Sequence, residues 1–191
     1  MKNLAIFASG NGSNFQAIAE AIKNRAISGA EIKILIVDHK DAYAIERAKS
    51  LGIPYCVFEL KQYKNKEEYE KAILNVLRER KVDLICLAGY MKIISDTLLN
   101  AYPDRIINIH PALLPSFKGA HGIQDAFDYG CKVYGVTIHY VSKELDGGKI
   151  IAQRGFEYYE DDIEKLEKRI HEVEHVLYPE TINRLIMEEK I

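Results

Sequence analysis

The chain has 191 residues, of which 48% are hydrophobic and 28% are charged, and its formal net charge is −2. This length fits one hydrophobic core and therefore one domain over residues 1–191, and the balanced charge argues against a nucleic-acid partner. No run reaches the roughly 20 apolar residues that span a membrane, and three dispersed cysteines with a strand directly after Met1 indicate a reduced, cytoplasmic protein.

Short apolar runs recur in the first part of the chain, and segments of helical period separate them. The runs that predict strands are Leu4–Ala8, Ile32–Val37, Tyr55–Phe58, Leu84–Ala88 and Ile106–Ile109. Apolar residues at helical spacing follow the first run, at 15–22, and recur at 69–77. Continuous apolar strands that alternate with helices predict an α/β fold with a mostly parallel sheet and helices on both of its faces.

The loop SGNGSN, residues 9–14, lies between the first strand and the first helix. Its free N–H groups at a helix N-terminus favour a phosphate. The loop lacks the third glycine of a dinucleotide fingerprint, where Phe15 stands, and the lysine of a P-loop. Asp38, near the end of the second run, stands where the ribose-binding acid of a dinucleotide site would be, so a dinucleotide site remains an alternative. A plain strand-to-helix turn, with Ser13 or Asn14 as the N-cap, is the other alternative.

Two polar side chains interrupt the apolar strand at 106–110. Asn108 and His110 are two residues apart, so both leave the same face of the strand near its carboxyl end, where ligands of open α/β sheets bind. An amide and an imidazole at this place could donate to an oxygen that becomes negative. His110 could instead be a polar residue with an ordinary structural partner.

The pattern changes after Pro115. Two longer runs, Val133–Val141 and Lys149–Tyr158, predict an antiparallel hairpin closed by SKELDGG. Asp146 in this loop fits a common Asp-Gly turn. If the loop folds over the face of Asn108 and His110, its carboxylate could favour protonated His110 and share in proton transfer. An acid, an imidazole and an amide suit acyl transfer without a covalent enzyme intermediate.

The last helix is predicted to start near DDIE, with Asp161 as the N-cap and Glu164 completing a capping box. Pro179 is expected to kink or end this helix. Histidines and cysteines show no recognised zinc spacing, and we expect no metal.

Five blocks together resemble one family in order and over nearly the whole chain. They are SGNGSNFQAI, LICLAGYMKIIS, INIHPALLPSFKGAHG, GVTIHYVSKELDGGKIIAQ and HEVEHVLYP. The chain is similar to the phosphoribosylglycinamide formyltransferases, folate-dependent enzymes of purine synthesis. The resemblance implies a single-domain, Rossmann-like formyltransferase fold. It also implies that residues up to about 100 bind the nucleotide and that the second half binds folate and carries the catalytic residues.

The same resemblance assigns the candidate site residues. It implies catalysis by Asn108, His110 and Asp146. The implied contacts with the substrate's phosphate and ribose are Gly12, Ser13, Asn14 and Glu174, and the implied contacts with folate are Lys66, Met91, Lys92, Ile93, Ile94, Val141 and Asp146. Lys66 and Lys92 stand where some members have arginine, and His171 is left unassigned.

The activity implied is transfer of a formyl group from 10-formyltetrahydrofolate, as co-substrate, to the amine of glycinamide ribonucleotide. The implied partners are these small molecules, without nucleic acid or membrane, for a monomer or homodimer. Another formyl-folate-dependent formyltransferase or hydrolase, or a nucleotide-binding module without activity, are the alternatives.

Overall fold

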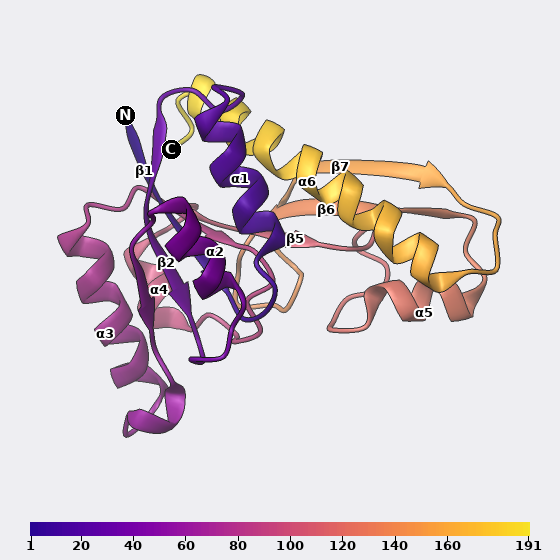
Figure 1. The fold of residues 1–191 in the computed structure, drawn as a ribbon. Coiled ribbons are helices and arrows are strands. Elements are labelled where there is room, and N and C mark those ends of the chain that lie inside the picture. Colours follow the sequence, from indigo (N-terminus) through magenta and orange to yellow (C-terminus); the bar gives the residue numbers. More distant parts are fainter.

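Seven strands form one sheet in the computed structural model, which describes residues 1–191 (Figure 1). The strands are β1 (Lys2–Ala8), β2 (Ala30–Val37), β3 (Tyr55–Val57), β4 (Leu84–Leu87), β5 (Ile106–His110), β6 (Val133–Tyr140) and β7 (Ile150–Glu157). Their order is β3-β2-β1-β4-β5-β6-β7. Neighbours from β3 to β5 are parallel, whereas β6 is antiparallel to both β5 and β7. The predicted mostly parallel sheet with an antiparallel C-terminal hairpin is confirmed.

Helices cover both faces of this sheet, as predicted. They are α1 (Ser13–Lys23), α2 (Ala44–Leu51), α3 (Lys66–Glu79), α4 (Asp96–Ala101), α5 (Gly122–Tyr129) and α6 (Ile163–Met187), and a short 3₁₀ helix spans Leu60–Gln62. Buried residues of α1, α2 and α6 belong to one apolar cluster, and those of α3 and α4 to a second. None of the helices has the length and apolar content needed to cross a membrane.

The second part of strand β1, residues 4–8, shows why the central strands contain continuous apolar runs. Leu4 and Ile6 belong to the first cluster, whereas Ala5 and Phe7 belong to the second. Because successive side chains of a strand point to opposite faces, a strand between two helical layers needs an apolar residue at each step. The strand is therefore fixed from both sides, and its carboxyl end delivers the glycine loop to one edge of the sheet (Figure 1).

Helix α6 corrects the predicted cap and excludes one of the two outcomes expected at Pro179, the end of the helix. Its N-cap is Asp162, whose side chain accepts a hydrogen bond from the N–H of Lys165, so the predicted cap at Asp161 is wrong by one residue. The predicted capping box is wrong as well, because the third helical position is Lys165 and not Glu164. The helix also continues through Pro179 to Met187, so the proline does not end it. Pro179 removes one backbone hydrogen bond, but the buried stripe on both sides of it packs against the sheet and outweighs that loss.

Tyr178 fastens α6 to the sheet. Its side chain is fully buried, and its hydroxyl donates to the carbonyls of Leu87, at 2.9 Å, and of Ile107, at 3.3 Å. We predict that Tyr178→Phe, which keeps the ring, lowers the free energy of unfolding by about 1 kcal/mol. Urea denaturation measures this as a lower midpoint with an unchanged slope.

The matched control is Tyr159→Phe, because Tyr159 is 68% exposed. Equal midpoint shifts in the two variants would contradict a stabilising role for the buried hydroxyl.

Candidate active site

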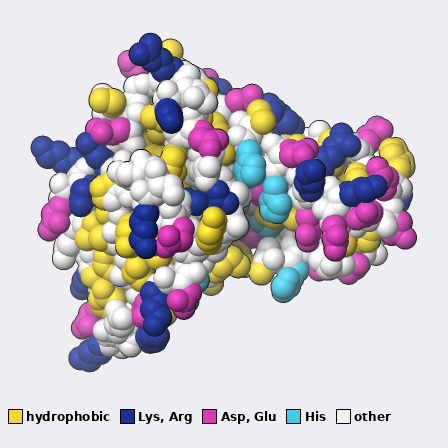
Figure 2. Space-filling model, in the orientation of Figure 1, with side chains coloured by type: hydrophobic (Ala, Val, Ile, Leu, Met, Phe, Trp, Pro, Cys, Tyr) yellow, Lys and Arg dark blue, Asp and Glu magenta, His cyan; other side chains and the backbone are white.

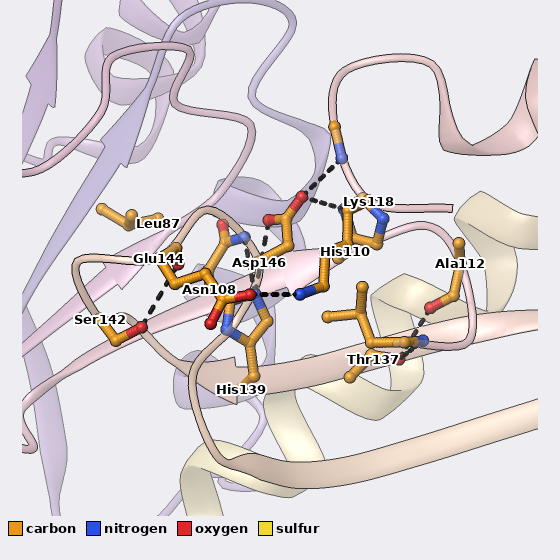
Figure 3. A network of polar contacts seen from close by, with 12 residues as sticks. Leu87, Asn108, His110, Ala112, Lys118, Thr137, His139, Ser142, Glu144 and Asp146 are labelled. Atoms are coloured by element: carbon orange, nitrogen blue, oxygen red, sulfur yellow. Dashed lines mark hydrogen bonds and ion pairs between the residues drawn. The ribbon is translucent and has the colours of Figure 1, made fainter. Parts of the chain in front are cut away.

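The structure brings the three predicted catalytic side chains together at the carboxyl end of β5 (Figure 3). Nδ1 of His110 lies 3.6 Å from Oδ2 of Asp146. The other ring nitrogen of His110, Nε2, donates to the carbonyl of Phe117 at 2.8 Å. His110 is 4% exposed. The imidazole is therefore enclosed, with a carboxylate on one side and a backbone carbonyl on the other.

Asp146 reaches the site because its loop folds back over β5. The sequence analysis gave this arrangement only as the condition under which Asp146 would act with His110. Its Oδ2 accepts a hydrogen bond from the N–H of Gly119 at 2.8 Å. The backbone of Asp146 is left-handed, with φ 50°, a conformation that Asp tolerates better than most residues. A Cβ at Gly148 would lie 1.6 Å from the carbonyl oxygen of Tyr140, so only glycine allows this close approach. The DGG sequence thus allows the backbone conformation that places the Asp146 carboxylate next to His110.

A fourth residue, His139, belongs to this cluster, and sequence reasoning missed it. Its Nε2 lies 3.2 Å from Nδ2 of Asn108 and 3.8 Å from Oδ1 of Asp146. His139 pairs directly with Asn108 across β5 and β6. The sequence does show a histidine inside the apolar strand GVTIHYV. Its pairing with Asn108 can be inferred only once the register of β5 and β6 is known.

The glycine loop lies at the carboxyl end of β1, before α1. Gly12 has φ 75° and is the N-cap of α1, so Ser13 and Asn14 lie inside the helix and the expectation that one of them is the cap is wrong. A Cβ at Gly12 would lie 2.6 Å from the Cβ of Ala44 in α2. The first N–H groups of α1 are therefore presented by a backbone that only glycine permits.

Arg47 of α2 braces this loop, which the sequence did not predict. Its Nε donates to the carbonyl of Asn11 at 2.8 Å, and one terminal nitrogen donates to Oδ1 of Asn11 at 2.6 Å. The other terminal nitrogen bonds Oε1 of Gln16. A groove of about 610 Å³ between α1 and α6 lies beside this loop, and Ser13, Arg47 and His175 are among its lining residues. The guanidinium thus adds positive charge where an anion was predicted.

Glu174 of α6 meets Asn14 of α1 although 160 residues separate them. Nδ2 of Asn14 donates to Oε2 of Glu174 at 3.2 Å, and Nδ1 of His171 lies 2.8 Å from the same oxygen. Glu174 is only 5% exposed, and Oδ1 of Asn14 is buried without a partner. The arrangement makes Glu174 a buried carboxylate next to the glycine loop, and the amide oxygen of Asn14 beside it accepts no hydrogen bond. In this view histidine side chains gather in a hollow of the surface (Figure 2).

The residues predicted to contact folate differ in their surroundings. Met91 and Ile93 are exposed, Ile94 is buried, and Val141 is partly buried. Nζ of Lys66 donates to the carbonyl of Ile93. A second groove, of about 810 Å³, is lined by Lys66, Ile94, Lys143 and neighbouring residues.

The other predicted folate lysine, Lys92, points towards β2. Its Nζ lies 3.9 Å from Oδ2 of Asp38, the residue for which the sequence allowed a role in dinucleotide binding. Both lysines therefore contact protein partners from other parts of the chain in this structure. No group of three His, Cys, Asp or Glu side chains is arranged to hold a metal ion.

Comparison with known proteins gives a consistent relationship. The family model described as formyl transferase matches residues 2–182. The chain is 49% identical to the phosphoribosylglycinamide formyltransferase of Bacillus subtilis, over 97% of the chain and 95% of that protein. It is 41% identical to the Haemophilus influenzae protein of the same name, over 94% of the chain and 84% of that protein.

Solved structures agree with the sequence relatives. The phosphoribosylglycinamide formyltransferase of Streptococcus pneumoniae superimposes with a TM-score of 0.91 at 50% identity, covering 97% of this chain and 99% of that one. Glycinamide ribonucleotide transformylase 1 of Geobacillus kaustophilus gives a TM-score of 0.94 at 47% identity, covering 97% and 98%.

The two histidines of α6 beside Glu174 provide a test of this geometry. The hydrogen bond to Glu174 raises the pKa of His171 above its ordinary value, whereas burial lowers the pKa of His175. The ion pair of His171 and Glu174 therefore stabilises the fold fully below the ordinary histidine pKa, and this contribution is lost as pH rises through the raised value. NMR titration of the unliganded protein should show His175 losing its proton at lower pH than His171.

Glu174→Gln should lower the pKa of His171, and Glu172→Gln, at an exposed neighbouring position, should leave it almost unchanged. A wild-type His171 that titrates at or below its ordinary value would contradict the pairing.

Proposed function

Because the chain belongs to the formyl transferase family, and within it to the phosphoribosylglycinamide formyltransferases, we infer that it transfers a formyl group from 10-formyltetrahydrofolate to the amine of glycinamide ribonucleotide in purine biosynthesis. The observation that supports this most directly is the meeting of Asn108, His110 and Asp146 at the sheet edge that also holds the glycine loop. The three side chains suit acyl transfer, and the glycine loop suits binding of the phosphate group of the acceptor substrate.

We propose the following roles in the reaction. The amine attacks the formyl carbon, a carbon–nitrogen bond forms, and the carbonyl oxygen becomes an oxyanion. Asn108 and His110 donate hydrogen bonds to this oxygen, and His110 does so by exchanging its bond to the Phe117 carbonyl for the new acceptor. Asp146, beside His110, assists removal of a proton from the attacking amine and its delivery to the folate nitrogen as the carbon–nitrogen bond to folate breaks. The formyl group thus moves without a covalent enzyme intermediate.

The nucleotide is proposed to lie along the start of α1. The N–H groups of Gly12, Ser13 and Asn14 lie at the helix N-terminus, where the helix dipole favours a phosphate, and Arg47 adds a nearby positive charge. Glu174 is proposed to accept hydrogen bonds from the ribose or from the amine, since a buried carboxylate accepts but cannot donate.

Folate is proposed to lie across the loop that holds Met91, Lys92, Ile93 and Ile94, with Val141 and Asp146 on its other side. The exposed apolar side chains of Met91 and Ile93 suit contact with a flat heterocycle, and apolar residues at a surface are typical of ligand sites. Lys66 borders the groove of about 810 Å³ and is proposed to meet the acidic end of folate. Lys92 would have to leave Asp38 to contact folate directly.

The resemblance implied that residues up to about 100 bind the nucleotide and that the second half binds folate and supplies catalysis. The roles proposed here depart from that division, because Glu174 meets the nucleotide and residues 66 and 91–94 meet folate. We also propose a cytoplasmic monomer or homodimer that uses neither nucleic acid nor a membrane. The three cysteines, all free, agree with a reducing compartment.

The activity is tested by following consumption of 10-formyltetrahydrofolate with and without glycinamide ribonucleotide. We expect consumption only when the nucleotide is present, with one formylated product per formyl-folate used. His110→Ala should lower this turnover on the order of 100-fold, which shows that it arises at this site. Equal consumption without the nucleotide would indicate a hydrolase, and binding without turnover would indicate a nucleotide-binding module.

The phosphate site is better tested at Ser13 than at Gly12, because any side chain at Gly12 meets Ala44 and strains the backbone. The first turn of α1 carries no acidic residue. Ser13→Asp should preserve the fold, since a carboxylate near a helix N-terminus is stabilising by roughly 0.3–1 kcal/mol, but its charge should repel phosphate. We predict that KM for the nucleotide rises about tenfold or more, with KM for folate unchanged.

The control is Ser13→Asn, which has nearly the same shape without the charge. If the Asp and Asn variants share the same KM for the nucleotide, the phosphate does not lie at this helix end.

A further inference from the structure

His139 is a buried titratable side chain to which the proposed mechanism gives no role. It lies in β6, is 2% exposed, and faces Asn108 on the adjacent strand β5. Its two ring nitrogens have different partners. Nδ1 is 2.8 Å from the carbonyl oxygen of Tyr140, and Nε2 is 3.2 Å from Nδ2 of Asn108.

These partners determine where the ring carries its proton. A carbonyl oxygen can only accept, so Nδ1 must hold a hydrogen and donate it to Tyr140. In a neutral imidazole the other nitrogen, Nε2, is then an acceptor. The amide nitrogen of Asn108 can only donate, so its hydrogen bond to Nε2 matches this tautomer.

A protonated ring would require the opposite orientation of Asn108, with the amide oxygen turned towards His139. Burial lowers the pKa of His139, and this effect exceeds the opposing effects of the Tyr140 carbonyl and of Asp146. Protonated His110 nearby would lower it further. The neutral ring with an accepting Nε2 is thus the form that fits both the contacts and the surroundings.

The carbonyl that sets the tautomer is itself held in place. The N–H of Tyr140 donates to the carbonyl of Lys149 at 2.9 Å, which closes the base of the β6–β7 hairpin. Gly148 packs directly against the Tyr140 carbonyl, as its missing Cβ allows. The loop that aims Asp146 at His110 therefore also fixes the acceptor for Nδ1 of His139.

We propose that His139 is a positioning residue: its Nε2 accepts one N–H of Asn108 and so holds the amide with the other N–H free for the oxyanion. This inference rests on the proposed function, in which Asn108 is an oxyanion donor. An amide held by a rigid acceptor is already oriented before the reaction, and such preorganisation favours the transition state over the substrate. His139 contacts no reacting atom in this scheme.

Two substitutions separate this role from simple packing. In His139→Gln the side-chain oxygen can take the place of Nε2 and accept from Asn108. In His139→Asn the shorter amide can replace only Nδ1, so the acceptor for Asn108 is lost. We expect His139→Asn to lower the single-turnover rate at saturating substrates about tenfold or more, and His139→Gln to keep it within about threefold of wild type, with KM for both substrates unchanged.

Circular dichroism confirms that each variant is folded before rates are compared. Equal losses in the two folded variants would overturn the proposal, because a packing role does not distinguish an acceptor at Nε2 from a donor at Nδ1. Wild-type rates in both variants would overturn it as well.

A second measurement does not depend on activity. ¹⁵N NMR of the imidazoles in the unliganded protein should show His139 as the neutral tautomer with its hydrogen on Nδ1 at neutral pH. A charged ring, or a hydrogen on Nε2, would overturn the proposal even if the protein turns over. If instead the wild-type protein shows the expected tautomer but no formyl transfer, the proposed function fails while the contact between His139 and Asn108 stands.

Discussion

The candidate site depends on one buried carboxylate, that of Asp146, being held by the N–H of Gly119 against the imidazole of His110, with His139 on its other side. Oδ2 is fixed by the N–H of Gly119 and faces His110, whereas Oδ1 faces His139. A buried carboxylate is costly unless it is paired and hydrogen-bonded, so this geometry constrains everything around it. The loop after β5 must supply the N–H, and the hairpin must fold back far enough to deliver the acid.

The sheet explains how the catalytic cluster and the glycine loop come to share one edge. Strands β1, β4 and β5 are parallel neighbours, so their carboxyl ends lie side by side. The glycine loop follows β1, and Asn108 and His110 end β5. Helix α6 crosses the same region and adds Glu174 next to Asn14. The glycine loop, the catalytic cluster and Glu174 thus lie close together at the carboxyl ends of these strands.

Much of this was readable from the sequence, for identifiable reasons. Continuous apolar strands signalled a sheet covered on both faces, and the two-residue spacing of Asn108 and His110 signalled a shared direction. Both signals are local, because they depend only on the period of a strand. The position of the glycine loop before a helix predicted a phosphate site, and Asp146 was predicted to join His110 if its loop folded back. The resemblance to known formyltransferases led to the same residues.

What the sequence could not supply depends on distant contacts. His139 is 31 residues from Asn108, and only the register of β5 and β6 makes them partners. Arg47 braces the glycine loop from another helix, and the lysines at 66 and 92 turn towards protein partners because those lie nearby in the fold. Pro179 lies inside α6 because tertiary packing outweighs the local preference.

The central claim is that the Asp146 carboxylate takes part in proton transfer and is not merely a support for its loop. It is tested most directly by the single-turnover rate of Asp146→Asn at saturating substrates, with the affinity for each substrate measured in parallel. The claim predicts a rate lower on the order of 100-fold or more with both affinities nearly unchanged, because the amide keeps the shape and removes the charge. A variant that retains its rate at saturation while its affinity for folate collapses would contradict the claim.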